Sequence, residues 1–336
     1  MIDEFSYPSE GDGIFGLGST EKESAVVLLP VPWEGTVSYG HGTSLGPRAI
    51  YEASFQLDLF DENFKPPYES GVFLLPEDET LVSLNEEAKK EHTSKHINPL
   101  SEKLNQRVYE SSKKVLTQGK ILGVLGGEHS SPYGALKAVD ELYSKKEDGF
   151  GIFHFDAHLD LRKAYEGYEH SHASIMNRAV TDFKSLQTLT QVGIRDFCEG
   201  EWKIVGSDER IYCYTDKKVR ESLYLGTPFK KIAEEIVSTL PEHVWVSFDI
   251  DGLDPKLCPG TGTPVPGGLQ FNEAILLIKE LANSGRKIIG FDLCEVAPLH
   301  GDLKNQWDGN VGSRILYQLI GWALHSMKRT KIPTPR

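Results

Sequence analysis

The sequence predicts an α/β protein with three layers (α/β/α), in which helices cover both faces of a mainly parallel central sheet. Short, nearly continuous apolar runs recur along the chain, and segments with helical periodicity lie between them. Strands that are apolar at almost every position are typical of a sheet buried on both faces. The alternation of such strands with helices is typical of parallel pairing.

The predicted elements follow this alternation from end to end. The apolar runs have the length of strands and cover residues 25–29, 121–125, 151–155, 189–194, 244–248 and 287–293. The periodic segments have the length of helices and cover residues 104–116, 132–142, 229–240, 272–281 and 312–327.

The remaining stretches fit one domain covering residues 1–336. The charged stretch 76–103 is expected to be an exposed polar insertion, either helix or loop, and the basic, Pro-containing stretch 328–336 a frayed tail. No internal repeat, low-complexity block or Pro/Gly-rich linker divides the series of elements.

Composition excludes several classes of partner. The 336 residues include 36 Lys and Arg against 49 Asp and Glu, a formal net charge of −13. This balance argues against nucleic acid and anionic membranes, which favour clustered basic residues, and would suit a cationic ligand. The four cysteines are far apart, with no CxxC pair, so neither a disulfide framework nor a cysteine zinc site is expected. The apolar runs are too short to span a membrane and the first residues are acidic, so we expect a cytoplasmic protein.

Three predicted strands are followed directly by clusters of acids and histidines. The sequence reads GGEHS at residues 126–130, DAHLD at 156–160 and DIDGLDP at 249–255. The carboxyl ends of parallel strands meet at one edge of the sheet, and alternate side chains of extended backbone share a face. The clusters therefore predict a site with six ligands: His129, Asp156, His158, Asp160, Asp249 and Asp251.

This ligand set favours a particular metal chemistry. Crowded carboxylates repel one another unless cations neutralise them. Carboxylates with a minority of imidazoles favour Mn²⁺, with Ni²⁺ or Co²⁺ as alternatives, over a thiolate zinc site. Six ligands fit two ions with bridging carboxylates. Any one of the clusters alone would more often be a turn, cap or loop, but all three together favour the metal site.

The motifs resemble the three signatures of the ureohydrolase family, which contains arginase, agmatinase, guanidinobutyrase and formimidoylglutamase. The stretch 35–50 (GTVSYGHGTSLGPRAI) resembles agmatinase-type members, and residues 262–269 and 295–298 extend the similarity. The resemblance covers roughly residues 25–325. It implies an arginase-like fold, a homo-oligomer (trimer or hexamer), and hydrolysis of a guanidinium group to urea and an amine by a metal-bridging hydroxide.

The resemblance also implies a role for each site residue. Each of the two manganese ions would have four ligands: one ion His129, Asp156, Asp160 and Asp249, the other Asp156, His158, Asp249 and Asp251. Asp160 would accept the first proton, and Glu295 would bind the guanidinium nitrogens. A histidine proton shuttle is expected as well. His172 fits the family pattern of His, Gly and Ser or Thr if Ala173 replaces the glycine. His170 fits the ungapped distance from Asp160 and is the alternative.

The substrate is expected to be a small cationic guanidino compound. Cys198 stands where the resemblance places the amino-binding Asp of arginase, and the loop 161–165 lacks an Asn/Ser/Thr-rich pattern. These departures favour agmatine, hydrolysed to putrescine in polyamine metabolism. The alternatives are 4-guanidinobutyrate, whose carboxylate would suit Arg162 and Lys163, and arginine or another small guanidine. Two hypotheses lie outside the hydrolysis of guanidino compounds. One is a non-catalytic metal-binding regulatory protein. The other is amide hydrolysis on the related deacetylase fold, whose single-zinc site does not need this full set of carboxylates.

Overall fold

The central sheet confirms the predicted α/β class. The computed structural model of the protein describes residues 13–144, 149–303 and 307–327. Its strands form one sheet of eight parallel strands, in the order β2-β1-β3-β8-β7-β4-β5-β6. The strands are β1 (Val26–Val31), β2 (Val72–Leu74), β3 (Ile121–Gly126), β4 (Phe150–Phe155), β5 (Leu186–Val192), β6 (Ile211–Tyr214), β7 (His243–Asp249) and β8 (Lys287–Cys294).

Two strands, β2 and β6, were not predicted from the sequence, and they form the two edges of the sheet. Both are short, and only the first residue of each is buried. An edge strand of three or four residues has no long apolar run to reveal it, because one side has no neighbouring strand to cover it. Strand β5 also ends earlier than predicted, at Val192, because the next residue, Gly193, has a φ of 92° that turns the chain out of the sheet.

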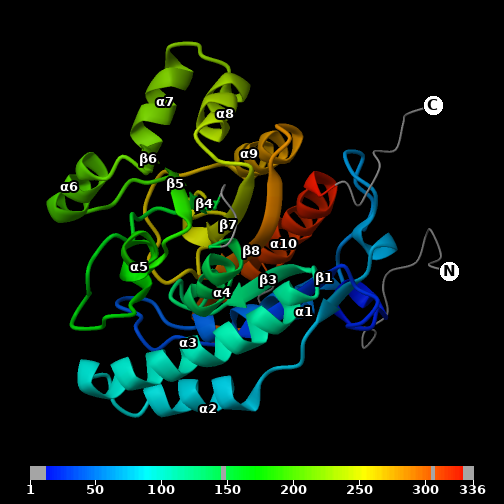
Figure 1. Ribbon diagram of the computed structural model, residues 1–336, viewed down its shortest axis with the longest axis vertical. Helices are drawn as coiled ribbons and strands as arrows, with labels where there is room; N and C mark the ends of the chain where they lie inside the picture. Colours follow the sequence, from blue (N-terminus) through cyan, green and yellow to red (C-terminus); the bar gives the residue numbers. More distant parts are fainter. Residues whose placement is uncertain (1–12, 145–148, 304–306, 328–336) are drawn as a thin grey trace.

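Helices cover both faces of the sheet, which completes the three layers. The helices are α1 (Gly46–Ser54), α2 (Glu79–Ala88), α3 (Ser94–Thr117), α4 (Tyr133–Tyr143), α5 (Ile175–Asp182), α6 (Glu199–Ser207), α7 (Asp216–Tyr224), α8 (Phe229–Ser238), α9 (Phe271–Asn283) and α10 (Trp307–Ser326). Helices α1 and α7–α10 share one apolar core with the sheet, and α2–α6 share the other. In Figure 1 the strands run between α3, low in the view, and α9 near the top.

The charged stretch 76–103 forms helix α2 and the first part of α3. Leu81, Ile97 and Leu100 are buried on the α2–α6 side of the sheet, while most of the charged residues stay exposed. Figure 1 shows α2 running beside α3, against which it packs. The single-domain boundaries stay a prediction, and the expected frayed tail, residues 328–336, lies outside the described residues. Within the described ranges, none of the helices combines the length and apolar character that crossing a bilayer needs.

The strand order brings the sequence motifs together. Strands β3, β8, β7 and β4 are neighbours at the centre of the sheet and all point the same way. Asp249 is the last residue of β7, and the segments that leave the other three strands carry His129, Glu295 and Asp156. Residues up to 166 positions apart in the chain therefore meet at one edge, where His129 and Glu295 are in direct contact.

Candidate metal centre

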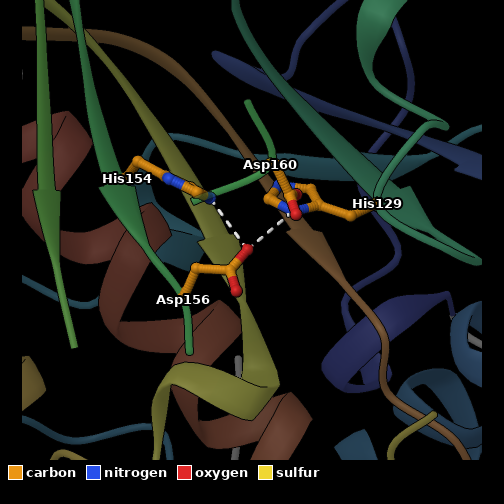
Figure 2. Close-up of side chains that lie close together, drawn as sticks. All are labelled: His129, His154, Asp156 and Asp160. Carbon is orange, nitrogen blue, oxygen red and sulfur yellow. Dashed lines mark hydrogen bonds and ion pairs between the residues drawn. The ribbon is translucent and has the colours of Figure 1, made fainter. Parts of the chain in front are cut away.

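A buried cluster of imidazoles and carboxylates surrounds His129. The Nδ1 atom of His129 lies 3.0 Å from Asp156 Oδ2, 3.0 Å from Asp160 Oδ2 and 3.3 Å from Asp249 Oδ2. Figure 2 shows His129 and Asp160 on one side of Asp156 and His154 on the other. These distances bring together the four residues predicted to hold one of the two ions.

A second group of side chains lies at the other carboxylate oxygen of Asp156, Oδ1. The Nδ1 atom of His158 lies 3.3 Å from Asp156 Oδ1 and 3.1 Å from Asp251 Oδ2. Asp156 thus presents one carboxylate oxygen to each group, which suits a residue that two ions share. Asp249 accepts a hydrogen bond from the backbone N–H of Asp251 at 2.9 Å.

The predicted residues converge, but not through extended backbone alone. The expectation that alternate positions of extended backbone bring all of these side chains together was wrong. Asp160 has a φ of 52°, in the left-handed region, so the chain turns sharply at this residue. Asp251 lies in a 3₁₀ turn, Ile250–Gly252, that follows β7. Both turns bring the side chains back toward Asp156, because a strand continued in the same direction would carry them away from the end of the sheet.

The electrostatics of the cluster suit cations. Burial, and next the charge of Asp156, raise the pKa of Asp160 to about 6. Burial and the nearby Asp251 raise the pKa of Asp249 well above its usual range. Burial alone would raise the pKa of Asp156 also, but His154 and the other histidines around it hold it well below its ordinary value. Crowded, buried oxygen donors with two imidazoles fit hard or borderline divalent cations, so the residues present fit a two-metal centre.

Glu295 is held beside this cluster by the backbone. Its Oε1 accepts a hydrogen bond from the His129 N–H at 2.8 Å, and its φ of 63° is left-handed. Burial, and next the charge of Glu128, raise the pKa of Glu295 well above its usual value. Gly262 leaves room near the other oxygen, since a Cβ there would lie 3.2 Å from Oε2. Strained backbone at a buried acid is typical of a functional site.

A cavity of about 370 Å³ opens onto the exposed edge of the cluster. His158 and Asp160 line it, together with Arg162 and His172. Burial, and next the charge of His158, lower the pKa of His172 to about 4, so its imidazole is neutral at neutral pH. His170 is not among the described residues that line the cavity, and its ring packs 5.0 Å from that of Tyr133.

Sequence reasoning missed several residues that support the cluster. Glu128 is part of the first motif but had no predicted role. Its carboxylate accepts hydrogen bonds from the Thr36 N–H (2.7 Å) and hydroxyl (2.5 Å), and the Thr36 hydroxyl accepts one from the His172 N–H (3.0 Å). His154, two residues before Asp156, contacts it directly. The period-two spacing of His154 and Asp156 could have indicated a shared face.

Comparison with known proteins places the chain among ureohydrolases. A model of the Arginase family matches residues 24–321. The N(1)-aminopropylagmatine ureohydrolase of Synechocystis sp. is 29% identical over 309 residues, covering 91% of this chain and 92% of that protein. The agmatinase of Bacillus anthracis is 30% identical over 301 residues, covering 90% of this chain and 93% of that protein.

A solved structure with the same architecture supports the fold. The agmatine ureohydrolase of Thermoplasma volcanium matches with a TM-score of 0.72 at 24% identity, covering 97% of both chains. At this identity the likeness concerns the fold alone, and it agrees with the eight-stranded parallel sheet described above.

Proposed function

The chain belongs to the arginase family and is an agmatinase-like ureohydrolase, and on that premise we propose that it hydrolyses agmatine to urea and putrescine at a two-metal centre. The observation that carries the choice of substrate is the composition of the cavity wall. At one end it reaches His158 and Asp160 of the cluster, and elsewhere it includes the exposed carboxylate of Asp196. A molecule with a guanidinium at one end and an ammonium at the other complements this wall.

The charges along the wall favour one distal ammonium over other head groups. Asp196 makes no ion pair with any described residue, so its carboxylate is available to a cation. The third acid of the wall, Glu201, lies 3.6 Å from the guanidinium of Arg162 and accepts hydrogen bonds from the backbone N–H groups of Leu161 and Cys198. Because Glu201 is paired with Arg162, the described part of the distal wall offers one unpaired acid, Asp196, which suits the single distal ammonium of agmatine better than the two amines of N(1)-aminopropylagmatine.

Arginine is disfavoured by the loop that begins at Asp196. Cys198 caps the start of helix α6, and it is not among the described residues that line the cavity. It therefore offers no carboxylate to an α-amino group. 4-Guanidinobutyrate would need Arg162 to leave Glu201 before it could pair with the carboxylate of the substrate.

The side chains of this chain have separable tasks in the proposed reaction. Two divalent cations, when bound, supply the charge that lowers the pKa of a water molecule toward neutrality. Glu295 is buried and is not among the described residues that line the cavity; in the proposed reaction it would accept hydrogen bonds from the guanidinium nitrogens through Oε2, because Oε1 already accepts one from the His129 N–H. Asp160 accepts the first proton at a carboxylate oxygen, since it belongs to the cluster and also lines the cavity. His172 lines the cavity with an imidazole that is neutral at neutral pH, so it first takes up a proton and then passes it to the leaving amine.

A substrate screen tests the proposal. Urea release is measured on manganese-loaded protein with agmatine, N(1)-aminopropylagmatine, arginine, 4-guanidinobutyrate and guanidine. The highest kcat/KM is expected for agmatine. Asp196→Asn should lower the kcat/KM for agmatine by raising KM. The same variant should leave the rate with guanidine unchanged, because guanidine has no ammonium tail. A preference for N(1)-aminopropylagmatine or arginine would refute the choice of agmatine. Absence of urea release with every compound would refute the hydrolase itself.

A further inference from the structure

Two buried side chains outside the predicted ligand set hold the carboxylate of Asp156. His154, in β4, and Gln191, in β5, are fully buried and face each other across the sheet, because their backbones are paired in register. His154 Nε2 lies 2.9 Å from Asp156 Oδ2, and His154 Nδ1 lies 2.9 Å from Gln191 Nε2. Figure 2 shows the His154 ring pointing at the Asp156 carboxylate from the left, while the His129 ring lies to the right.

The backbone carbonyl of Leu159 determines which atoms carry protons in the hydrogen bonds that link Gln191, His154 and Asp156. It lies 2.9 Å from Gln191 Nε2, and a carbonyl only accepts hydrogen bonds, so the atom facing it is the NH₂ of the amide. The same NH₂ faces His154 Nδ1, which must therefore accept. The proton of a neutral His154 is then on Nε2, from which it is donated to Asp156 Oδ2.

This arrangement also decides between two roles for His154. A histidine that coordinates a metal through Nε2 needs a lone pair on that atom and its proton on Nδ1. Here the Gln191 NH₂ donates to the lone pair of His154 Nδ1. A proton on Nδ1 would point at this NH₂ group and would have no acceptor. His154 therefore acts on Asp156 and not on the metal.

Asp156 needs such support because a carboxylate rotates easily. The terminal torsion of an Asp side chain has a broad, shallow energy profile, so packing alone leaves its two oxygens poorly oriented. Asp156 Oδ1 is held by the His158 N–H at 2.5 Å, and Oδ2 is held by His154 from the other side. With both oxygens fixed, each faces one of the two groups of ligands described above.

We propose that His154 and Gln191 are positioning residues, which orient the Asp156 carboxylate so that it can serve both metal ions. The inference rests on the two-metal centre of the proposed function. Residues that orient metal ligands through hydrogen bonds typically change metal affinity or activity about 10- to 100-fold when they are replaced.

The test measures Mn²⁺ binding to the chelator-treated full-length protein by calorimetry, and urea release from agmatine at saturating Mn²⁺. His154→Phe keeps the shape of the ring and removes the N–H, and Gln191→Met keeps the length of the side chain and removes the amide. His154→Gln restores an N–H donor. Thr190→Val is the matched control, because Thr190 is buried on the same strand as Gln191 and, among the described residues, its hydroxyl pairs with that of Thr239 and not with the metal cluster.

The expected result is Mn²⁺ binding weakened about 10- to 100-fold in His154→Phe and less in Gln191→Met, with partial recovery in His154→Gln. At saturating metal, kcat should fall more than KM rises, because Asp156 acts on the metal and not on the substrate. Thr190→Val should bind Mn²⁺ as the wild type does. A merely structural role would lower the melting temperature without this pattern.

Each other outcome has a defined meaning. Wild-type Mn²⁺ affinity and kcat in both His154→Phe and Gln191→Met would overturn the inference while leaving the proposed function in place. If His154→Phe does not fold, Gln191→Met alone decides the matter, since it leaves the imidazole in the core. A wild-type protein that binds no Mn²⁺ and releases no urea would instead refute the proposed function, and the positioning role with it.

Discussion

At the scale of single residues, the two candidate proton shuttles differ in their surroundings. His172 lines the cavity, and among the described residues its Nε2 has no hydrogen-bond partner. Its pKa of about 4, lowered by burial and by the charge of His158, leaves the ring neutral above that pH and able to take up a proton. His170 instead packs on Tyr133, and burial lowers its pKa as well.

The first prediction separates these histidines. His172→Ala is expected to lower kcat about 10²- to 10⁴-fold, the usual contribution of a positioned acid or base, with a small effect on KM. Added imidazole should restore part of the rate, because the cavity can admit a small base in place of the missing ring. His170→Ala is the control and should keep a kcat near that of the wild type, measured by urea release across pH. A larger loss in His170→Ala than in His172→Ala would reverse the assignment.

The candidate ligands could be predicted from the sequence, whereas the residues behind them could not. Each ligand cluster is contiguous in the sequence and follows a predicted strand. Because the carboxyl ends of parallel strands meet at one edge of the sheet, this was enough to predict that the clusters lie together. The support of Asp156 depends on Gln191, which faces His154 only through the pairing of β4 with β5. Thr36 similarly reaches Glu128 across 92 positions of the chain. Such contacts follow from sheet register and loop packing, which local patterns do not contain.

At the scale of secondary-structure elements, Asp78 connects two helices. Its side chain caps α2 by accepting the Thr80 N–H at 2.8 Å, and it accepts a second bond from Arg107 Nε of α3 at 2.6 Å. Burial is the largest single influence and raises the pKa of Asp78, but the hydrogen bonds from Arg107 and Thr80 and the charge of Arg107 together outweigh it, so the net pKa lies below its usual value. The start of α2 therefore depends on an ionised carboxylate.

The second prediction concerns the pH dependence of this cap. Asp78→Ala is expected to destabilise α2 by about 1 kcal/mol at pH 7, since an N-cap is lost, whereas Asp78→Asn should cost less because Asn also caps helices. A lowered pKa means that the stabilisation is present above the unfolded pKa and is lost as pH falls through the folded value. The difference between wild type and Asp78→Ala should therefore shrink in acid. Hydrogen exchange of residues 79–88 measures it, and identical exchange in both proteins at pH 7 would contradict the role.

Burial accounts for part of the difference between the predicted and the observed elements. Central strands and the long helices α3, α4, α8, α9 and α10 were predicted because their apolar faces repeat over ten or more residues or form an unbroken buried run. Helices such as α6 and α7 were missed because they bury few residues, Glu201 alone in α6 and Val219 alone in α7. Their starts depend on capping contacts, at Cys198 and Thr215, that carry little apolar periodicity.

At the scale of the whole molecule, the carboxyl ends of four central strands meet at one edge of the sheet, and the acids that they bring together there repel one another. The carboxyl groups of Asp160, Asp249 and Glu295 all have raised pKa values, and burial is the first cause of each, so their ionised forms are unfavourable in this environment. Bound cations would offset that repulsion at the end of β7 and in the segments that follow β4 and β8. Metal binding should therefore stabilise the folded protein in addition to its role in the reaction.

The third prediction is a melting temperature that depends on metal. Removal of metal with a chelator should lower the melting temperature, and Mn²⁺ should restore it in a saturable way. One ion at 100 times its dissociation constant contributes about 2.7 kcal/mol. In a chain of this size each kcal/mol shifts the midpoint by roughly 2 °C. The variant Asp249→Asn serves as the control: it lacks one of the crowded charges, so its metal-free form should melt above the metal-free wild type and gain less from Mn²⁺. Equal melting temperatures for the wild type with and without metal would show that the cluster is stable without cations, and would remove the physical argument for a two-metal centre.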